Sequence, residues 1–176
     1  MQYISTQFIN AARKGDLHVM IKLIEQDDNI CVKDKEAIII ASINSKWNIV
    51  IWLVLHGSDV NADDGLPLLC AVRGYDYPTI KFLLQNNANV HSQNDLALKL
   101  SSQNGNLKVV ELLILYGAKV DADDNYPIIA AASHGNYDIV KILIKNGADP
   151  FARKSEAIEV AKLGGHLDII SLINSL

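Results

Sequence analysis

The side chains that could perform catalysis in this chain of 176 residues are few and scattered. Ser133, His134 and Asp138 have the residue types of a nucleophile, a general base and a group that orients the base. Ser133 and His134 are adjacent in sequence, however, and adjacent positions on a helix point in different directions. We therefore expect no reaction at this trio and predict that the protein is not an enzyme.

The acidic residues and the histidines do not follow a metal-binding pattern either. Two segments rich in aspartate could suggest calcium loops, but both lack the glycine turn and the closing bidentate glutamate. The five histidines occupy five different positions of the repeat described next, so stacking would not gather them as zinc ligands. No glycine-rich loop suited to phosphate is present. We predict no metal and no cofactor.

A period of thirty residues runs through the chain without insertion or deletion. Self-similarity at a fixed period of ~20 to 50 residues is the signature of a stacked array of repeats. Residues that recur at one position of the period are Gly105, Gly135 and Gly165, then Leu113 and Leu143, and then Gly117 and Gly147.

Each repeat contains the patterns of two helices. In the first, an apolar residue is followed three positions later by a small one, as in Ile128 and Ala131, which marks a buried face with a close neighbour. In the second, apolar residues form an amphipathic stripe. The sequence thus predicts an all-α protein with a polar loop after each helix pair. Four loop residues are predicted to cap the next helix: Asp34, Asp64, Asn94 and Asp124.

Two successive repeats resemble the ankyrin repeat. The resemblance rests on the run GNLKVVELLILYGAKVDA, followed by YPIIAAASHGNYDIVKILIKNGAD, and it extends over essentially the whole chain. Ankyrin repeats normally have about 33 residues and a Thr-Pro-Leu-His opening. This chain has a period of 30 and keeps only Pro67 and Pro127 of that opening. The resemblance predicts an ankyrin-type solenoid of about six stacked helix-turn-helix repeats, with shortened loops that contain little or no strand.

Thirty-residue arrays of this kind are also similar to the ankyrin proteins of giant DNA viruses of amoebae. We predict one domain over residues 1–176, whose two end repeats are caps with water-compatible outer faces. The predicted boundaries are 1–33 for the N-terminal cap, 34–63, 64–93, 94–123 and 124–153 for repeats two to five, and 154–176 for the C-terminal cap.

Composition and charge disfavour several classes of partner and location. The net charge of −4 argues against nucleic acid and anionic membranes, which bind clustered basic surfaces. The longest apolar run, residues 49–55, is far shorter than the ~20 residues of a membrane span, and the start MQYISTQF lacks the features of a signal peptide. Cys31 and Cys70 are predicted to stay reduced. We expect an intracellular, cytoplasmic protein, in the host cell if it is viral.

The resemblance implies a protein partner, bound by the loop tips and by the C-terminal ends of the first helices. An alternative is an adaptor that delivers a host protein to a larger complex such as a ubiquitin ligase. For any single candidate residue, a merely solvated polar position is the other interpretation. The candidates are Arg13, Lys14, Asn44, Arg73, Gln103, Asn104 and His134 on the helix row, and Asp64, Asn94 and Asp124 on the loop row.

The loop row has a predicted charge pattern. It is expected to be acidic at its centre, where Asp64 and Asp124 lie, and basic at its two tips, where Lys33 and Arg153 lie. A partner that reads this edge would associate more slowly as salt is raised.

A second candidate surface is apolar. On the outward face of the second helix the repeat places charge, as at Lys81 and Lys141, whereas the first two repeats place Ile21 and Ile51 there. Leu55 lies one turn beyond Ile51. We expect these three residues to form an exposed patch for a partner or for another copy of the chain. A monomer is predicted, with weak self-association through this patch as the alternative.

Overall fold

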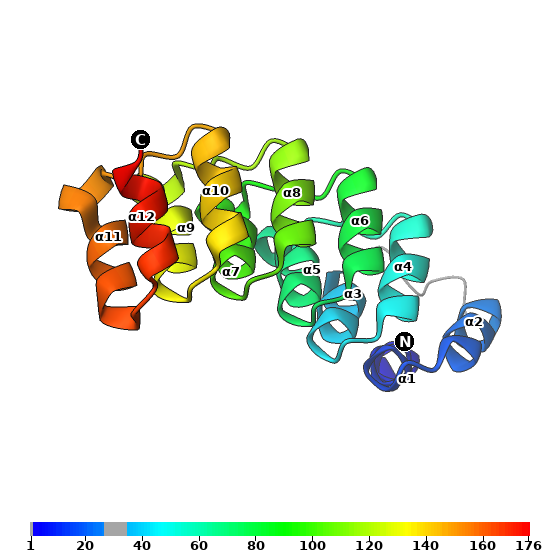
Figure 1. The fold of residues 1–176 in the computed structure, drawn as a ribbon. Helices are drawn as coiled ribbons and strands as arrows, with labels where there is room; N and C mark the ends of the chain where they lie inside the picture. The colour runs from blue at the N-terminus through cyan, green and yellow to red at the C-terminus, as the bar shows by residue number, and fades with distance from the viewer. Residues whose placement is uncertain (1, 27–34) are drawn as a thin grey trace. The chain divides into compact units, whose positions relative to one another are not determined.

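The computed structural model describes residues 2–26 and 35–176, and within these ranges it contains twelve α-helices and no strand (Figure 1). The all-α prediction is confirmed. The chain divides into two compact units, Met1–Asn89 and Val90–Leu176. The described part of each unit holds three helix pairs, in which a first helix is followed by a second helix after a tight turn.

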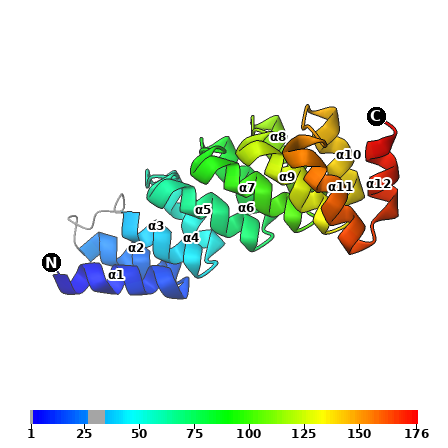
Figure 2. The ribbon, with the colours of Figure 1, turned by 90° about the vertical axis from the view of Figure 1, so that its left-hand side faces the viewer.

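In the first unit, hereafter unit 1, the first helices pack side by side, with α3 between α1 and α5. Each first helix also packs on the second helix of its own pair, and α4 packs on α6 (Figure 2). The helices are α1 (Gln2–Lys14), α2 (Leu17–Gln26), α3 (Lys35–Ile43), α4 (Trp47–Leu55), α5 (Ala62–Arg73) and α6 (Tyr77–Gln85).

The second unit, unit 2, repeats this arrangement. Among its first helices α9 lies between α7 and α11, and among its second helices α10 packs on both α8 and α12. The helices are α7 (Ser92–Gln103), α8 (Leu107–Leu115), α9 (Ala122–Ser133), α10 (Tyr137–Lys145), α11 (Ala152–Gly164) and α12 (Leu167–Asn174).

The core of each unit is made by the apolar positions that recur with the period. Small residues such as Ala41 and Ala131 are fully buried between neighbouring first helices, where a larger side chain would hold the helices apart. The fully buried side chains include Ile38 and Leu68 in the first helices of unit 1, Leu98 and Ile128 in those of unit 2, and Leu53, Leu83, Leu113 and Leu143 in the second helices.

The chain enters the first helix of a new pair through a left-handed turn of three residues. Asp123, Asp124 and Asn125 have φ angles of 53°, 54° and 62°, and the N–H of Asn125 donates to the carbonyl of Asp121 at 3.0 Å. The same conformation recurs at residues 63–65, 93–95 and 153–155. The predicted short loops without strand are thus confirmed over the part of the chain that is described.

These turns correct the predicted helix caps. Asp64, Asn94 and Asp124 have left-handed backbones, with φ of 52°, 57° and 54°, whereas an N-cap residue usually has an extended backbone. Asn and Asp enter the left-handed region more readily than most other residues because their short polar side chains can bond locally. In these turns Asp and Asn therefore serve to adopt the left-handed backbone, and they do not serve as N-caps. The fourth predicted cap, Asp34, lies outside the described residues.

A side-chain amide or carboxylate links two of these turns to the next loop. The N–H of Lys119 donates to Asp95 Oδ1 at 3.0 Å, and the N–H of Asp149 donates to Asn125 Oδ1 at 2.7 Å. Gly65 occupies the equivalent position in unit 1 and has no side chain. Asn61 replaces it there.

Asn61 makes this link from four positions earlier in the chain. Its Oδ1 accepts from the N–H of Asn89 at 2.7 Å, and its Nδ2 donates to the carbonyl of Asn87 at 3.1 Å. In the loops that contain Asn89, Lys119 and Asp149, one backbone N–H is therefore satisfied by the preceding loop, whichever residue supplies the oxygen.

Replacing Leu113 by Ala is expected to lower the free energy of unfolding by about 2–5 kcal/mol, because this side chain is fully buried in α8. Lys141→Ala, at an exposed position of α10 in the same unit, should change it by less than about 0.5 kcal/mol. Urea denaturation followed by circular dichroism measures both effects. Equal shifts of the two midpoints would show that the buried stripe is misassigned.

Replacing Asn61 by Ala is expected to cost about 1–2 kcal/mol, because the N–H of Asn89 and the carbonyl of Asn87 lose their partner. Adding Gly65→Asn to this variant should restore part of the loss, since Asn125 makes the link from that position. Thermal and urea denaturation of the two variants provide the comparison. No loss in the single variant would show that water replaces the bonds at no cost.

Candidate functional site

Four of the predicted helix-row residues lie close together at the C-terminal ends of the first helices of unit 1. Arg13 and Lys14 end α1, Asn44 follows α3, and Arg73 ends α5, and all four side chains are exposed. Because α1, α3 and α5 pack side by side, their ends form one continuous surface. We call this surface the turn edge of unit 1, and we define it as Arg13, Lys14, Ile43, Asn44, Ser45, Lys46, Arg73, Gly74 and Tyr75.

A groove of about 400 Å³ lies on this edge, where α3 meets α5. Its apolar part comes from Ile43, which is 58% exposed, and from the half-buried Leu66 and Cys70. Ser42 in the groove wall is buried, and its hydroxyl donates to the carbonyl of Ile38 at 2.7 Å. The remaining lining residues are Ser45, Arg73 and Gly74.

The environment of Cys70 reflects its place in the groove. Burial raises the pKa of the Cys70 thiol above its ordinary value, and the nearby Arg73 guanidinium opposes part of this rise. The thiol is therefore mostly protonated near neutral pH, which makes it a weak nucleophile. Because Cys70 lines the groove, the rate at which its thiol is alkylated would show whether a ligand occupies the groove.

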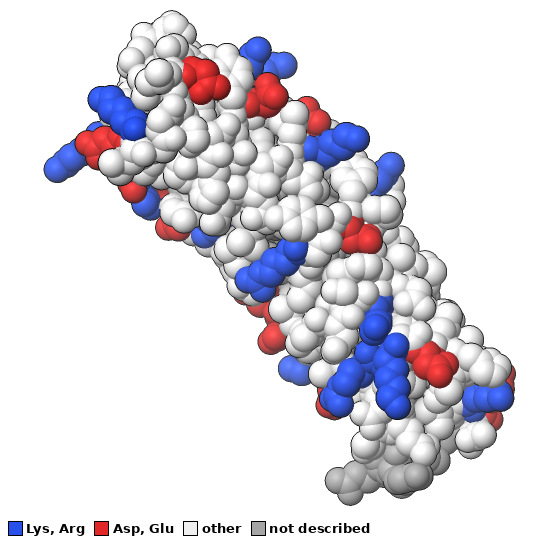
Figure 3. Space-filling model, turned by 60° about the horizontal axis from the view of Figure 1, so that its bottom comes forward, with Lys and Arg blue, Asp and Glu red and all other residues white. Residues whose placement is uncertain are grey.

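The turn edge of unit 1 is rich in positive charge. The Lys46 side chain passes close to Gly15 in the α1–α2 turn. A methyl group in place of the Gly15 hydrogen would lie only 3.0 Å from Lys46 Cδ. Lys46 therefore stands between Lys14 on α1 and Arg73 on α5. Figure 3 looks onto the side of the turns and shows Lys and Arg side chains gathered toward the N-terminal end of this face. Within the described residues, no carboxylate lies within ion-pair distance of Lys14, Lys46 or Arg73.

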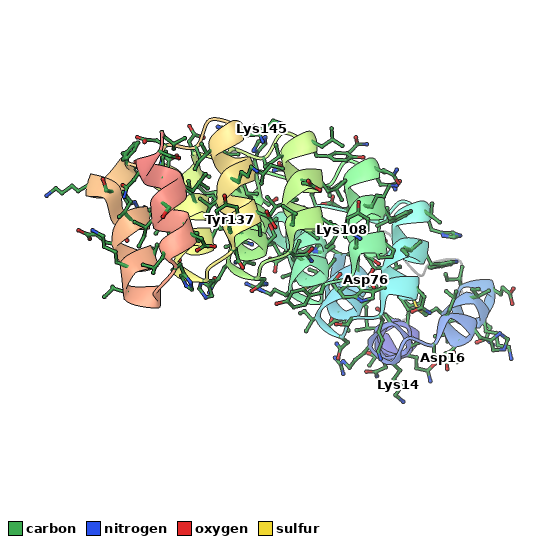
Figure 4. The ribbon with its side chains drawn as sticks, viewed as in Figure 1. Lys14, Asp16, Asp76, Lys108, Tyr137 and Lys145 are labelled. Atoms are coloured by element: carbon green, nitrogen blue, oxygen red, sulfur yellow. The ribbon has the colours of Figure 1, made fainter. Side chains whose placement is uncertain are left out.

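The two carboxylates in the turns of unit 1 are engaged by helix starts. Asp16 Oδ1 accepts from the N–H of Val19 at 3.1 Å, and Asp76 Oδ1 accepts from the N–H of Thr79 at 2.8 Å. Figure 4 marks both of them, with Lys14, at the turns. Each is held against the first turn of the following helix, where the helix dipole favours negative charge. The charge that they offer to a partner is reduced accordingly.

Tyr75 is an exposed residue of the turn edge that sequence reasoning missed. It occupies the turn position that holds glycine in the repeats of Gly105 and Gly135, yet its φ is 58°. A bulky side chain in this region costs about 1 kcal/mol or more relative to glycine. The Tyr75 side chain is 57% exposed beside Arg73 and Gly74. The signal was present in the sequence as a break in the glycine pattern, and such strained residues are common at functional sites.

None of the helix-row candidates of unit 2 is a Lys, Arg, Asp or Glu. Gln103 is half-buried, and Asn104 and His134 are exposed at the ends of α7 and α9. Asn136 Nδ2 donates to the carbonyls of Ser102 and Gln103, at 2.8 and 3.0 Å, and so closes the end of α7. The equivalent edge of unit 2 therefore has neither the cations nor the exposed tyrosine of unit 1.

The structure partly corrects the account of Ser133 and His134. Their side chains do not point apart, because Ser133 Oγ lies 2.7 Å from His134 Nδ1. Both atoms also contact the carbonyl of Ala130, Ser133 Oγ at 2.9 Å and His134 Nδ1 at 3.0 Å. Within the described residues no hydrogen bond joins Asp138 to His134. The pair satisfies a carbonyl at the end of α9, and the third member of a catalytic trio is not in place.

The predicted charge pattern of the loop row does not hold in unit 2. Arg153 Nε lies 3.4 Å from Asp124 Oδ2, and an Arg153 guanidinium nitrogen donates to the carbonyl of Asp123 at 2.7 Å. Lys99 Nζ lies 3.5 Å from Asp123 Oδ2, and the Arg153 guanidinium also lies 5.9 Å from the centre of the Tyr126 ring. The part of the expected acidic centre that lies in unit 2, Asp123 and Asp124, is thus paired with cations of the same unit.

The remaining loop-row candidates lie elsewhere on the left-handed turns. Asp64 in unit 1 and Asn94 in unit 2 are both exposed. Lys33, at the expected basic tip, lies outside the described residues. The loop row is therefore a weaker candidate than the turn edge of unit 1.

The apolar residues of the second patch differ in exposure. Leu55 is 65% exposed and Ile21 is 38% exposed, whereas Ile51 is half-buried. Beside Leu55, the indole of Trp52 stacks on the imidazole of His56 with 4.0 Å between the ring centres. A role for this patch stays a prediction.

The described ranges contain neither a metal-binding cluster nor a membrane-spanning helix. No group of three His, Cys, Asp or Glu side chains there could hold a metal ion. None of the helices in that part of the chain is long and apolar enough to cross a membrane.

Comparison with known proteins now assigns the family. The family model for ankyrin repeats in three copies matches residues 8–94, 68–154 and 98–174. The chain belongs to the ankyrin repeat family. Its helix pairs form an ankyrin solenoid of about six repeats, and ankyrin repeats are generally modules for protein–protein interaction.

One similar solved structure is the crystal structure of an ankyrin repeat domain from Acinetobacter baumannii AYE. Its TM-score is 0.79 at 24% identity, and the match covers 96% of each chain. This likeness shows the fold alone. No protein of curated function matches the sequence.

Alkylation of Cys70 is expected to be slow near neutral pH and to accelerate as the pH rises toward its elevated pKa. Arg73→Met should slow it further, because the guanidinium favours the thiolate. The measurement uses a Cys31→Ser background, so that a single thiol reacts, and follows its rate against pH. A rate as fast as that of free cysteine would show that the groove is more open than described.

Proposed function

We propose that this ankyrin repeat protein is a non-catalytic module that binds a protein partner through the turn edge of unit 1. The main support is the groove where α3 meets α5. It places apolar side chains beside the exposed Arg73 guanidinium, on two helices that pack on each other. Arg73 and the aromatic Tyr75 stand next to it, and Arg and Tyr are enriched at the energetic centres of protein interfaces.

Pre-organisation supports this proposal. The ends of α1, α3 and α5 are held by helices whose apolar faces are fully buried, so their backbone would lose little freedom on binding. Tyr75 keeps a left-handed backbone at a turn position that holds glycine in four of the six repeats and Ser45 in one, although glycine would relieve the strain. A benefit from its side chain would explain why a tyrosine stands there.

The proposal includes a cellular setting. We propose an intracellular, cytoplasmic protein that acts as a monomer, and the similarity to arrays of giant viruses stays a prediction. The adaptor alternative shares the first step, because an adaptor must also bind the protein that it delivers. It differs in requiring a second set of partners, such as the subunits of a ubiquitin ligase.

Affinity purification of the tagged chain from the cells that make it, followed by mass spectrometry, tests the proposal. We expect a reproducible partner that is lost when Arg73→Glu is combined with Tyr75→Gly. The control combines Lys141→Glu with Lys145→Glu on exposed positions of α10, and it should keep the partner. Circular dichroism must show that all variants are folded.

Two results would contradict the proposal. A partner that is retained by the turn-edge variant and lost by the α10 variant would place the binding surface elsewhere. An enzymatic activity of the purified protein that disappears on His134→Ala would show that the module is not purely a binding one. Recovery of ligase subunits with the partner would favour the adaptor role.

A further inference from the structure

We infer that the turn edge of unit 1 binds an acidic, extended segment of its partner, which inserts one apolar side chain into the groove between α3 and α5. This inference rests on the proposed function and specifies the chemistry of the partner. It depends on three features of the edge: its unpaired cations, the apolar floor of the groove, and the contrast with the same edge of unit 2.

The cations are spread over three consecutive turns. Lys14 lies on the first turn, Lys46 on the second and Arg73 on the third, and no described carboxylate pairs with them. Arg13 lines a recess together with Glu36, and Lys14 lines another with Asp16, whose carboxylate accepts from the N–H of Val19. A row of single charges on successive turns suits a chain of carboxylates better than one compact anion. The expected ligand is therefore an extended acidic segment.

The contrast with unit 2 shows that this charge does not follow from the fold. At the positions of Lys14, Lys46 and Arg73, the first two repeats of unit 2 have side chains other than Lys and Arg. They are Asn104 and His134 for Lys14, Asn106 and Asn136 for Lys46, and Gln103 and Ser133 for Arg73. The ankyrin scaffold therefore does not require cations at this edge. The chain as a whole carries a net charge of −4, whereas the turn edge carries four cations. Asp16 and Asp76 hold the position of Lys46 in the neighbouring repeats, and each bonds the start of the helix that follows it.

The groove adds an apolar requirement beside the charge. Its volume of about 400 Å³ is within the usual range for ligand sites, and Ile43, Leu66 and Cys70 give it an apolar floor. Burying an apolar side chain there would contribute about 25 cal/mol for each Å² removed from water. Arg73 lines the groove itself. One apolar residue flanked by carboxylates would therefore meet both requirements together.

Protein is favoured over nucleic acid as the source of the negative charge. A nucleic acid would be expected to find a wide basic surface, whereas two of the cations near the loop row of unit 2, Lys99 and Arg153, are already paired with Asp123 and Asp124. RNA is nevertheless a polyanion that could read the same row. It is included in the test.

The test uses a short synthetic peptide of alternating Glu and Asp around one central Phe. Binding to the full chain is measured by fluorescence anisotropy with the peptide labelled at its end. We expect affinity to fall about tenfold or more on Lys46→Glu with Arg73→Glu, and to fall steeply as salt rises from about 0.05 to about 0.5 M. The α10 control, Lys141→Glu with Lys145→Glu, should bind the peptide like the wild type.

Occupation of the groove is measured separately. In the Cys31→Ser background the peptide should slow alkylation of Cys70 several-fold, and a peptide with Ala in place of Phe should protect it less. Ile43→Ser, which removes apolar surface without adding charge, should weaken binding of the Phe peptide while leaving the Ala peptide nearly unaffected. A peptide in which Gln and Asn replace all the acidic residues should neither bind nor protect.

The inference is overturned if the acidic peptide binds with an affinity that does not depend on Lys46 and Arg73, or if it leaves Cys70 unprotected. It is also overturned if a polyuridine RNA binds the turn edge and the peptide does not. These failures are distinct from failure of the proposed function. A native partner that is lost with the turn-edge variants, while the acidic peptide does not bind, would remove this inference and leave the binding module intact.

Discussion

The constraint on which the structure depends is the short distance along the chain between successive helix pairs. A repeat of thirty residues leaves no room for a projecting hairpin, so the chain turns through three left-handed residues. That conformation is costly for most residue types. The turns are rich in Asp and Asn for this reason, and the side chain of Asp95 or Asn125 also bonds the N–H of the next loop. Backbone strain and cohesion between repeats therefore come from the same residues.

The two units have the same helices and different surfaces. In unit 2, Arg153 and Lys99 pair with the aspartates of the left-handed turn, and the turns between paired helices are neutral. In unit 1, cations stand on three successive turns without such partners among the described carboxylates. Since the buried stripes are alike, the difference does not arise from folding requirements. It is the kind of difference expected where one part of a repeat array has been specialised for recognition.

Much of the fold could be predicted from the sequence, and the reason is periodicity. Residues such as Leu113 and Leu143 must meet equivalent neighbours, so one correct assignment determines the others. The left-handed turns could not be predicted in this way, because Asp64 and Asn94 have chemistry that suits both a helix cap and a positive φ. Local patterns alone do not distinguish these two uses.

The site was only partly predictable for a different reason. The phase of the repeat placed Arg73 and Lys14 on an exposed edge, but the groove depends on how Ile43 and Leu66 pack in three dimensions. The neutralisation of Asp124 by Arg153 joins side chains from successive loops, whose distance no spacing rule provides. Tyr75 could have been found, since it and Ser45 are the two residues that interrupt the glycine recurring at this turn position.

The bonds between loops also have a direction. Asn125 is synthesised before Asp149, whose N–H it accepts, and Asn136 donates back to carbonyls at the end of the earlier helix α7. Each new repeat thus finds the polar groups that it needs on a repeat already made. Chains emerge from the ribosome with the N-terminus first. A unit of this kind can therefore fold one repeat at a time during synthesis, each new repeat packing on the repeat made before it.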